Sequence, residues 1–240
     1  GIPIQIHKEH QIYVPQLIFG NLLSSSNYDD SKKRTTGGLN GLGAKLTNIY
    51  STEFVIETVS SGQKYIQTFR NNMSIIEEPK IEKAKAREKE YCKITFKPDH
   101  TRFGTKSLKD DFTLDILKKR VFDVSAITPK TVSVHFNGDK IKCKDFSEYV
   151  NYYIGSKSDS PRVYFEEPNG RWQVCVALAK SDNFQHVSFV NGLSTIDGGS
   201  HVDHVILPII KKCTEEIQAK HKNITVKPQY VKDSLFVFIN

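Results

Sequence analysis

The sequence lacks the features that define several protein classes. No apolar run approaches the roughly 20 residues needed to cross a bilayer, and residues 1–20 carry no signal-peptide pattern. Cysteine is scarce, and no two cysteines form a CxxC pair of the zinc or redox kind. The four are Cys92, Cys143, Cys175 and Cys213. We therefore expect a soluble, intracellular protein whose cysteines are free and buried.

Size and charge narrow the class further. A chain of 240 residues has room for one large domain or two small ones with real cores. Its hydrophobic content of 38% is ordinary for a globular protein. The formal net charge of +7 suits a polyanionic partner, although charge alone does not identify one.

Glycine is concentrated in one stretch. Four glycines occur within seven positions: Gly37, Gly38, Gly41 and Gly43. Leu46, Ile49 and Tyr50 follow at helical spacing, which predicts a glycine-rich loop that leads into a helix. Glycine lets a backbone approach a bound group closely, and the free N–H groups at a helix start attract phosphate. Lys45 adds a positive charge one turn into the helix.

The two best-known phosphate loops do not fit this spacing. A Walker A loop needs lysine and then serine or threonine directly after its second glycine, but Ala44 follows Gly43 and Leu46 follows Lys45. A Rossmann fingerprint starting at Gly41 would need glycine at Leu46 and a strand before the loop. On composition alone, a flexible surface loop stays open as an alternative.

The full string resembles a known family. Thr-Gly-Gly-x-Asn-Gly-x-Gly-Ala-Lys at residues 36–45, after Ser-Ser-Asn-Tyr-Asp-Asp at 25–30, is similar to the ATP lid of eukaryotic and viral type IIA DNA topoisomerases, which are GHKL ATPases. Residues 1–4, 13–20, 188–192 and 198–203 also resemble motifs of that family. The charged residues 29–34 are expected to form an exposed, mobile part of the lid.

The resemblance implies a nucleotide site. Ser25, Ser26 and Asn27 would lie at the ribose and phosphates, and Thr95 would approach the adenine. The phosphates would be bound by Gly38, Leu39, Asn40, Gly41, Leu42, Gly43, Ala44 and Lys45. Leu39 and Leu42 depart from the basic residue and the tyrosine common in cellular enzymes, so nucleotide affinity or lid closure is expected to differ.

The implied cofactors are ATP and Mg²⁺, but the implied catalytic groups are absent. The family's catalytic glutamate, its magnesium-binding asparagine and its adenine-reading aspartate belong upstream of Gly1. A glutamine and a lysine at the γ-phosphate belong beyond Asn240. The chain opens within a family motif, so we interpret it as a fragment that holds no catalytic residue and does not hydrolyse ATP alone.

The expected fold is α/β (α+β) in two domains. Residues 1–145 would form a GHKL (Bergerat) ATPase sandwich without its N-terminal part, and residues 146–240 a ribosomal-protein-like transducer domain without its C-terminal part. Alternating patterns predict hairpins at 53–70 and 131–144, the second around Asn137-Gly138. Apolar periodicity predicts helices at 108–127, 145–154 and 201–221. The charged run 77–90 is expected to be a solvated loop.

The C-terminal half contains the other candidate sites. Lys220, His221 and Lys222 match a lysine-rich DNA contact of the family, and a plain solvated helix end is an equal alternative. His201 and His204 lie one turn apart beside Asp203, but no third ligand follows at motif spacing, so no metal site is expected. No nucleophile elbow accompanies a serine.

The resemblance implies ATP-driven passage of one DNA duplex through another, with homodimer closure on ATP binding and double-stranded DNA as partner. The protein would work inside the cell, in the nucleus if it is cellular and eukaryotic, or in a host cell or virion if it is viral. One alternative is a GHKL clamp of mismatch-repair or chaperone type that cuts no DNA. Another is a catalytically inactive binding module.

Overall fold

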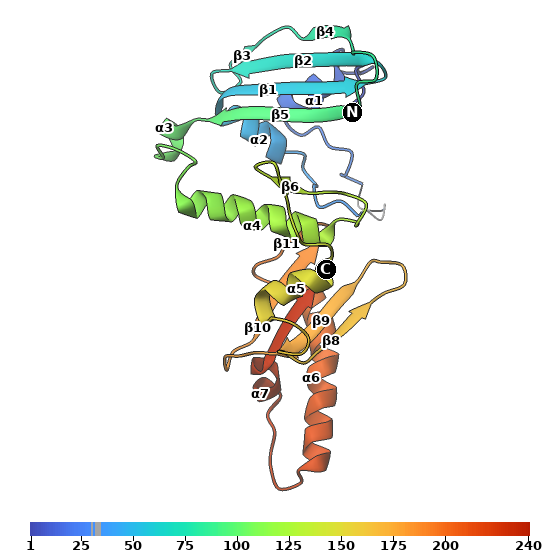
Figure 1. The fold of residues 1–240 in the computed structure, drawn as a ribbon, viewed down its shortest axis with the longest axis vertical. Helices are drawn as coiled ribbons and strands as arrows, with labels where there is room; N and C mark the ends of the chain where they lie inside the picture. Colours follow the sequence, from blue (N-terminus) through green and yellow to red (C-terminus); the bar gives the residue numbers. More distant parts are fainter. Residues whose placement is uncertain (30, 32–34) are drawn as a thin grey trace. The chain divides into compact units, whose positions relative to one another are not determined.

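The computed structural model describes residues 1–29, 31 and 35–240. Contacts group the chain into two compact units, shown in Figure 1. The N-terminal unit is Gly1–Arg34 with Gly38–Asp110, and the C-terminal unit is Thr35–Gly37 with Asp111–Asn240. The domain boundary expected after residue 145 stays a prediction. The expectation for residues 29–34 falls largely on 30 and 32–34, which lie outside the described residues.

The N-terminal unit is built on one antiparallel sheet with the order β3-β2-β1-β5. The predicted hairpin is confirmed as β1 (Ser51–Ser60) and β2 (Gln63–Arg70), which pair from Glu53↔Arg70 to Ser60↔Gln63. Its turn residues Ser61 and Gly62 both have positive φ, as a tight hairpin requires. β5 (Tyr91–Pro98) pairs with β1, and β3 (Ile75–Ile76) pairs with β2.

Part of the charged run predicted as a loop is a strand. β4 (Lys80–Lys83) pairs with β2, and all four of its residues are exposed. A strand that pairs on one side and faces solvent can consist largely of charged residues, which also discourages further pairing. The high charge of residues 77–90 therefore indicated exposure correctly but concealed the pairing.

Two seven-residue helices belong to this unit, α1 (Val14–Gly20) and α2 (Gly43–Ile49). Phe19 of α1 packs with Phe54, Ile56 and other apolar residues on one face of the sheet. The predicted helix after the glycines is confirmed, but its buried residues are Lys45 and Asn48, whereas Leu46 is exposed. A short third helix, α3 (His100–Phe103), follows β5.

The expectation that all four cysteines are buried is wrong for Cys92. Cys143 and Cys175 are buried and Cys213 is half-buried, but Cys92 is exposed. Cys92 lies on β5, which is the end strand of its sheet. Phe96, on the same strand and the same sheet face, is likewise exposed.

The C-terminal unit begins with α4 (Asp111–Ile127) and a short hairpin of β6 (His135–Phe136) and β7 (Asp139–Lys140). Asn137 and Gly138 in its turn have positive φ, which confirms the predicted turn. α5 (Phe146–Ile154) follows, and its first turn is capped by Asp145, whose carboxylate accepts a hydrogen bond from Glu148 N.

The second sheet has the order β11-β10-β12-β9-β8. Its strands are β8 (Arg162–Glu166), β9 (Gln173–Leu178), β10 (Gln185–Val190), β11 (Leu193–Ser194) and β12 (Leu235–Ile239). β10 and β12 run parallel, and the other pairs are antiparallel. β8 and β9 pair across the turn Pro168-Asn169-Gly170.

Helices cover both faces of this sheet. α5 packs through Phe146 and Val150 against a cluster that includes Phe238 of β12. α6 (Ser200–Lys220) and α7 (Pro228–Asp233) pack on the other face, where Val202 and Ile206 meet Val237. The central strand β12 is therefore apolar on both faces. α6 contains Pro208 in its interior. None of the described helices is long and apolar enough to cross a membrane.

Candidate functional site

The glycine-rich loop of the N-terminal unit lies against the polar run that precedes it in the sequence. The Asn27 side-chain amide donates to the Gly38 carbonyl oxygen at 2.6 Å. The Tyr28 hydroxyl donates to the Asn40 carbonyl oxygen at 3.1 Å. The structure thus brings together the two segments that the sequence analysis assigned to one nucleotide site, and their backbones are joined by side chains of the polar run.

Three of the four glycines of this loop, Gly38, Gly41 and Gly43, have different structural reasons for being glycine. Gly41 has φ +59°, and a Cβ atom there would lie 2.8 Å from the Ser24 carbonyl oxygen. The protein's own packing therefore requires glycine at this position. Gly38 and Gly43 have no atom within 4 Å of such a Cβ and do not need positive φ. The open space beside them is what a closely approaching ligand would use.

The start of α2 provides free backbone donors. The helix begins at Gly43, its N-cap residue Leu42 makes no side-chain capping bond, and its first bond runs from Leu46 N to Leu42 O at 2.8 Å. The N–H groups of Gly43, Ala44 and Lys45 therefore have no partner within the helix. An anion at this end would accept hydrogen bonds from them.

Lys45 has a different position from the one expected. Its side chain is buried, with 3% of the residue exposed, and its ammonium group donates to the Ser24 carbonyl oxygen at 3.0 Å. Burial lowers the pKa of Lys45 from its usual value. Lys45 thus ties the loop to the polar run, and it does not project an ammonium group into open space.

The remaining predicted residues of the loop are mostly exposed. Ser25 Oγ accepts a hydrogen bond from Asn27 N at 3.2 Å, whereas Ser26 is exposed. Leu39 is also exposed and Leu42 is half-buried. Exposed side chains at Ser26 and Leu39 leave the loop accessible from solvent.

Thr95 is not brought to this site. It pairs with Val55 across β1 and β5, on the sheet face that carries Glu53 and Glu57. α1 packs on the opposite face, beside Phe54 and Ile56. Because successive side chains of a strand point to opposite faces of the sheet, Thr95 lies on the face away from α1. Cys92, three positions earlier, lies on the face with α1.

Two contacts of this site had no clear signal in the sequence. Asn48 is fully buried and its side-chain amide donates to Phe19 O at 3.1 Å, which joins α2 to the end of α1. Its Oδ1 atom has no hydrogen-bond partner among the described residues. Ser24 Oγ donates to Leu17 O and Asn21 O, so Ser24 is anchored on α1. In the sequence, the three-residue spacing between Lys45 and Asn48 is the only sign that these two residues share one face of α2.

The predicted DNA contacts lie where α6 ends in the C-terminal unit. The side chain of Lys220 is 73% exposed, and its ammonium group is 3.9 Å from the Glu216 carboxylate. His221 caps the helix, and both His221 and Lys222 are exposed. These charges are accessible to a polyanion, and the geometry is equally that of a solvated helix end.

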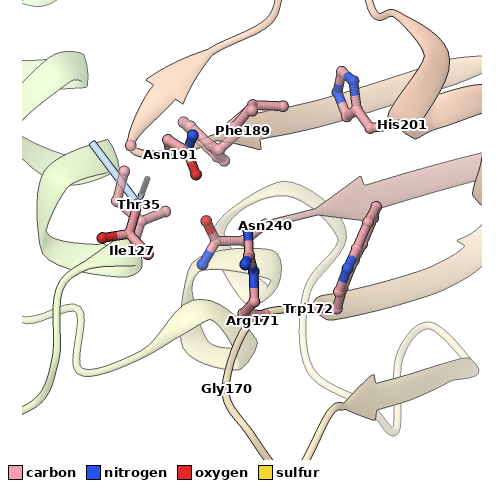
Figure 2. A pocket seen from close by; sticks show the side chains of 11 residues that line it. Thr35, Ile127, Gly170, Arg171, Trp172, Phe189, Asn191, His201 and Asn240 are labelled. Atoms are coloured by element: carbon pink, nitrogen blue, oxygen red, sulfur yellow. The ribbon is translucent and has the colours of Figure 1, made fainter. Parts of the chain in front are cut away.

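His201 and His204 point to different partners. His201 Nε2 is 3.0 Å from Thr195 Oγ1, whereas the His204 ring lies 6.1 Å from the ring of Trp172. This unit also has a cavity of about 320 Å³. Its lining residues include His201, Trp172, Arg171 and Asn240 (Figure 2). The Asn240 amide is bonded to Gln173 Oε1 at 2.8 Å. This cavity was not predicted from the sequence.

The comparisons with known proteins support a GHKL-type fold and similarity to an ATPase region. The family described as DNA gyrase B matches residues 145–240. A probable DNA topoisomerase 2 of Dictyostelium discoideum is 45% identical over all of this chain and 16% of its own length.

Two solved structures match the whole chain. The ATPase region of Saccharomyces cerevisiae topoisomerase II has a TM-score of 0.89 at 45% identity, and this chain covers 61% of it. The ATPase and transducer domains of DNA topoisomerase II from Balamuthia mandrillaris have a TM-score of 0.92 at 41% identity, again with 61% covered. The predicted fold class is therefore confirmed.

The chain is similar over its whole length to type II DNA topoisomerases. It matches the ATPase region of these enzymes and spans about a sixth of the length of the curated Dictyostelium relative, 16%.

Proposed function

We propose that this chain is the ATP-binding part of a type II DNA topoisomerase, with ATP bound at the loop from Gly38 to Lys45. The observation that carries the proposal is the loop geometry. Gly41 is required by its φ and by Ser24, while Gly38 and Gly43 border open space next to free N–H groups of α2. A polyphosphate uses that combination of close approach and backbone donors.

The described residues fit the phosphates better than the rest of the nucleotide. Asn27 and Lys45 hold the loop in shape through Gly38 O and Ser24 O, so their role is to position backbone donors. Ser25 and Ser26 are the proposed ribose-side contacts. Thr95 faces the other side of the sheet and is a weak candidate for the adenine. The Mg²⁺ that accompanies ATP would be bound by residues outside this loop, because the loop offers no carboxylate.

We assign residues 1–145 to the ATPase domain and 146–240 to the transducer domain. The start of the gyrase B match at residue 145 supports this boundary. The contact units divide earlier, after Asp110, because α4 packs with α5 and β6. On this proposal α4 belongs in function to the first domain and in packing to the second.

The proposed activity of the whole protein is passage of one DNA duplex through a transient break in another. ATP, when bound, supplies the free energy for closing a homodimer, and its hydrolysis resets the enzyme. Lys220, His221 and Lys222 would contact DNA phosphates without reading sequence. The proposed place of action is inside the cell, in the nucleus of a cellular eukaryote or in a host cell or virion for a viral protein.

The test is binding of a non-hydrolysable ATP analogue, with Mg²⁺, to the protein at its full natural length. Gly43→Val adds a side chain where the protein itself leaves space. We expect this variant to keep the thermal stability of the wild type and to lose nucleotide binding and nucleotide-dependent dimerisation. Ala219→Val, on the exposed side of α6, is the matched control. Equal binding by wild type and Gly43→Val would reject the loop as the nucleotide site.

A further inference from the structure

Three potential metal ligands gather on a loop that precedes α1. His7, Glu9 and His10 each offer one ligand atom, and these atoms lie within 4.8 Å of one another. It is the one group of this kind among residues 1–29, 31 and 35–240. His7 is half-buried, and Glu9 and His10 are exposed. The nucleotide site described above does not include any of the three.

The backbone gives this loop a defined shape. Ile6 and Tyr13 form an isolated antiparallel bridge, so the loop is closed at its base. Inside the bridge, His7 N donates to Ile12 O at 2.8 Å and Gln11 N donates to His7 O at 2.9 Å. Gln11 has φ +53°, which turns the chain back toward Ile12. The ordering of the backbone is therefore already present before any ligand binds, which lowers the entropic cost of binding.

The two imidazole rings have the separation that a shared ion requires. Nitrogen ligands bind Zn²⁺ at about 2.0 Å in tetrahedral geometry, and a ring centre lies about 1 Å beyond its nitrogen, so two bound rings have centroids about 5 Å apart. The centroids of His7 and His10 are 5.0 Å apart, with the ring planes inclined by 46°. Only the ligating nitrogens and the Glu9 carboxylate need to converge further, by side-chain rotation.

We propose that His7, Glu9 and His10 form a binding site for a divalent transition metal, with Zn²⁺ as the reference ion. Two imidazole nitrogens and one carboxylate oxygen are a ligand set for Zn²⁺, Ni²⁺ or Cu²⁺, whereas Mg²⁺ prefers oxygen ligands only. The site is therefore distinct from the magnesium that accompanies ATP. Its fourth position would hold water, because Glu9 and His10 face solvent.

Two features of the loop oppose binding, and both are weak. Glu9 N and His10 N lie 3.4 Å from His7 Nδ1, so metal binding would give up these contacts, which are at the long limit for hydrogen bonds. Lys8 brings a positive charge next to the site, but exposed charges are well screened by water. The expected result is a site of moderate affinity that stabilises the entry to α1.

The proposal is tested by titrating Zn²⁺, and separately Co²⁺, into untagged, EDTA-treated protein. We expect one ion per chain and Co²⁺ absorption bands of a tetrahedral site. His10→Gln should weaken zinc binding at least about tenfold. Loss of even a residue that only hydrogen-bonds to a metal ligand lowers metal affinity by about 10–100-fold. His135→Gln, in the exposed hairpin of β6 and β7, should leave zinc binding unchanged.

Thermal melting separates loss of a ligand from loss of the fold. The metal-free variants His7→Gln, Glu9→Gln and His10→Gln should melt as the metal-free wild type does, whereas Zn²⁺ should raise the melting temperature of the wild type alone. Failure of the wild type to bind one equivalent, or full binding by the double variant of His7 and His10, would overturn the proposal. ATP-analogue binding is measured in parallel, so this outcome is independent of the proposed function.

Discussion

The two lysine sites assigned to phosphate groups differ in almost every physical respect. Lys45 of the N-terminal unit is 3% exposed and donates to a backbone carbonyl oxygen at 3.0 Å. The side chain of Lys220, in the C-terminal unit, is 73% exposed and lies 3.9 Å from its carboxylate partner. The first is a structural group in a shaped loop, whereas the second is an exposed charge on a helix end.

The comparison teaches that a lysine near a proposed phosphate site need not act through its charge. In the loop, the donors that remain free are backbone N–H groups of α2, and Lys45 keeps them in place. At the end of α6, Lys220 and Lys222 are exposed to solvent. Substitutions in the loop should therefore alter both shape and binding, while substitutions at the helix end should alter only binding that depends on salt.

The largest expected effect is that of Gly41→Val. Valine at φ +59° is strained by about 1–3 kcal/mol, and its Cβ would lie 2.8 Å from Ser24 O. Loss of two phosphate hydrogen bonds at about 1.5 kcal/mol each would weaken ATP-analogue binding about 100-fold. Calorimetric titration and urea unfolding measure both effects. Gly38→Ala, which meets no atom within 4 Å, is the control that should retain full stability.

Lys45→Met should have the next largest effect. It leaves Ser24 O without its donor, at a cost of about 1–3 kcal/mol, partly offset because a buried charge is removed. The net loss in the free energy of unfolding should be about 1 kcal/mol, measured in urea. Burial lowers the pKa of Lys45, so the penalty of burying its ammonium group falls as pH rises from the folded-state pKa toward 10.5. The wild type therefore gains stability over this pH range, and the loss caused by Lys45→Met should become larger. A variant that gained stability throughout would show that the bond to Ser24 has no structural role.

The double substitution Lys220→Gln and Lys222→Gln should leave stability within about 0.5 kcal/mol, because exposed side chains contribute little. DNA binding should weaken, and the slope of log affinity against log salt should become less negative by about 2. Fluorescence anisotropy with duplexes of two unrelated sequences measures the slope. An unchanged slope would favour the plain solvated helix end.

The smallest expected effect is that of a substitution at Glu57. The exposure of its side chain, 22%, is intermediate between the exposures of Lys45 and Lys220. A hydrogen bond from the Tyr91 hydroxyl, followed by the Lys64 ammonium, holds the pKa of Glu57 below its usual value of 4.5. Because the folded-state pKa is the lower one, the carboxylate adds stability above pH 4.5 and loses it as pH falls through the folded-state value. Glu57→Gln should cost under about 1 kcal/mol at pH 7 and less at pH 3. Urea unfolding at both pH values tests this, and an equal loss at both would exclude the ionised form as its source.

Local pattern predicted much of the fold. Alternation predicted the hairpin of β1 and β2, Asn137-Gly138 predicted the turn before β7, and apolar periodicity predicted α6. These signals succeed because the period of burial is set by backbone geometry within one element. β4 was missed because a strand on the exposed edge of a sheet carries no apolar alternation.

The sequence by itself determined the family resemblance, the glycine loop and the order of the elements, because these depend on residues close together in the chain. Tertiary structure alone decided that Lys45 and Asn48, not Leu46, form the buried face of α2, that Thr95 faces away from α1, and that Cys92 is exposed. The physical reason is that burial and hydrogen-bond partners depend on groups distant in sequence, such as Ser24 O for Lys45 and Phe19 O for Asn48.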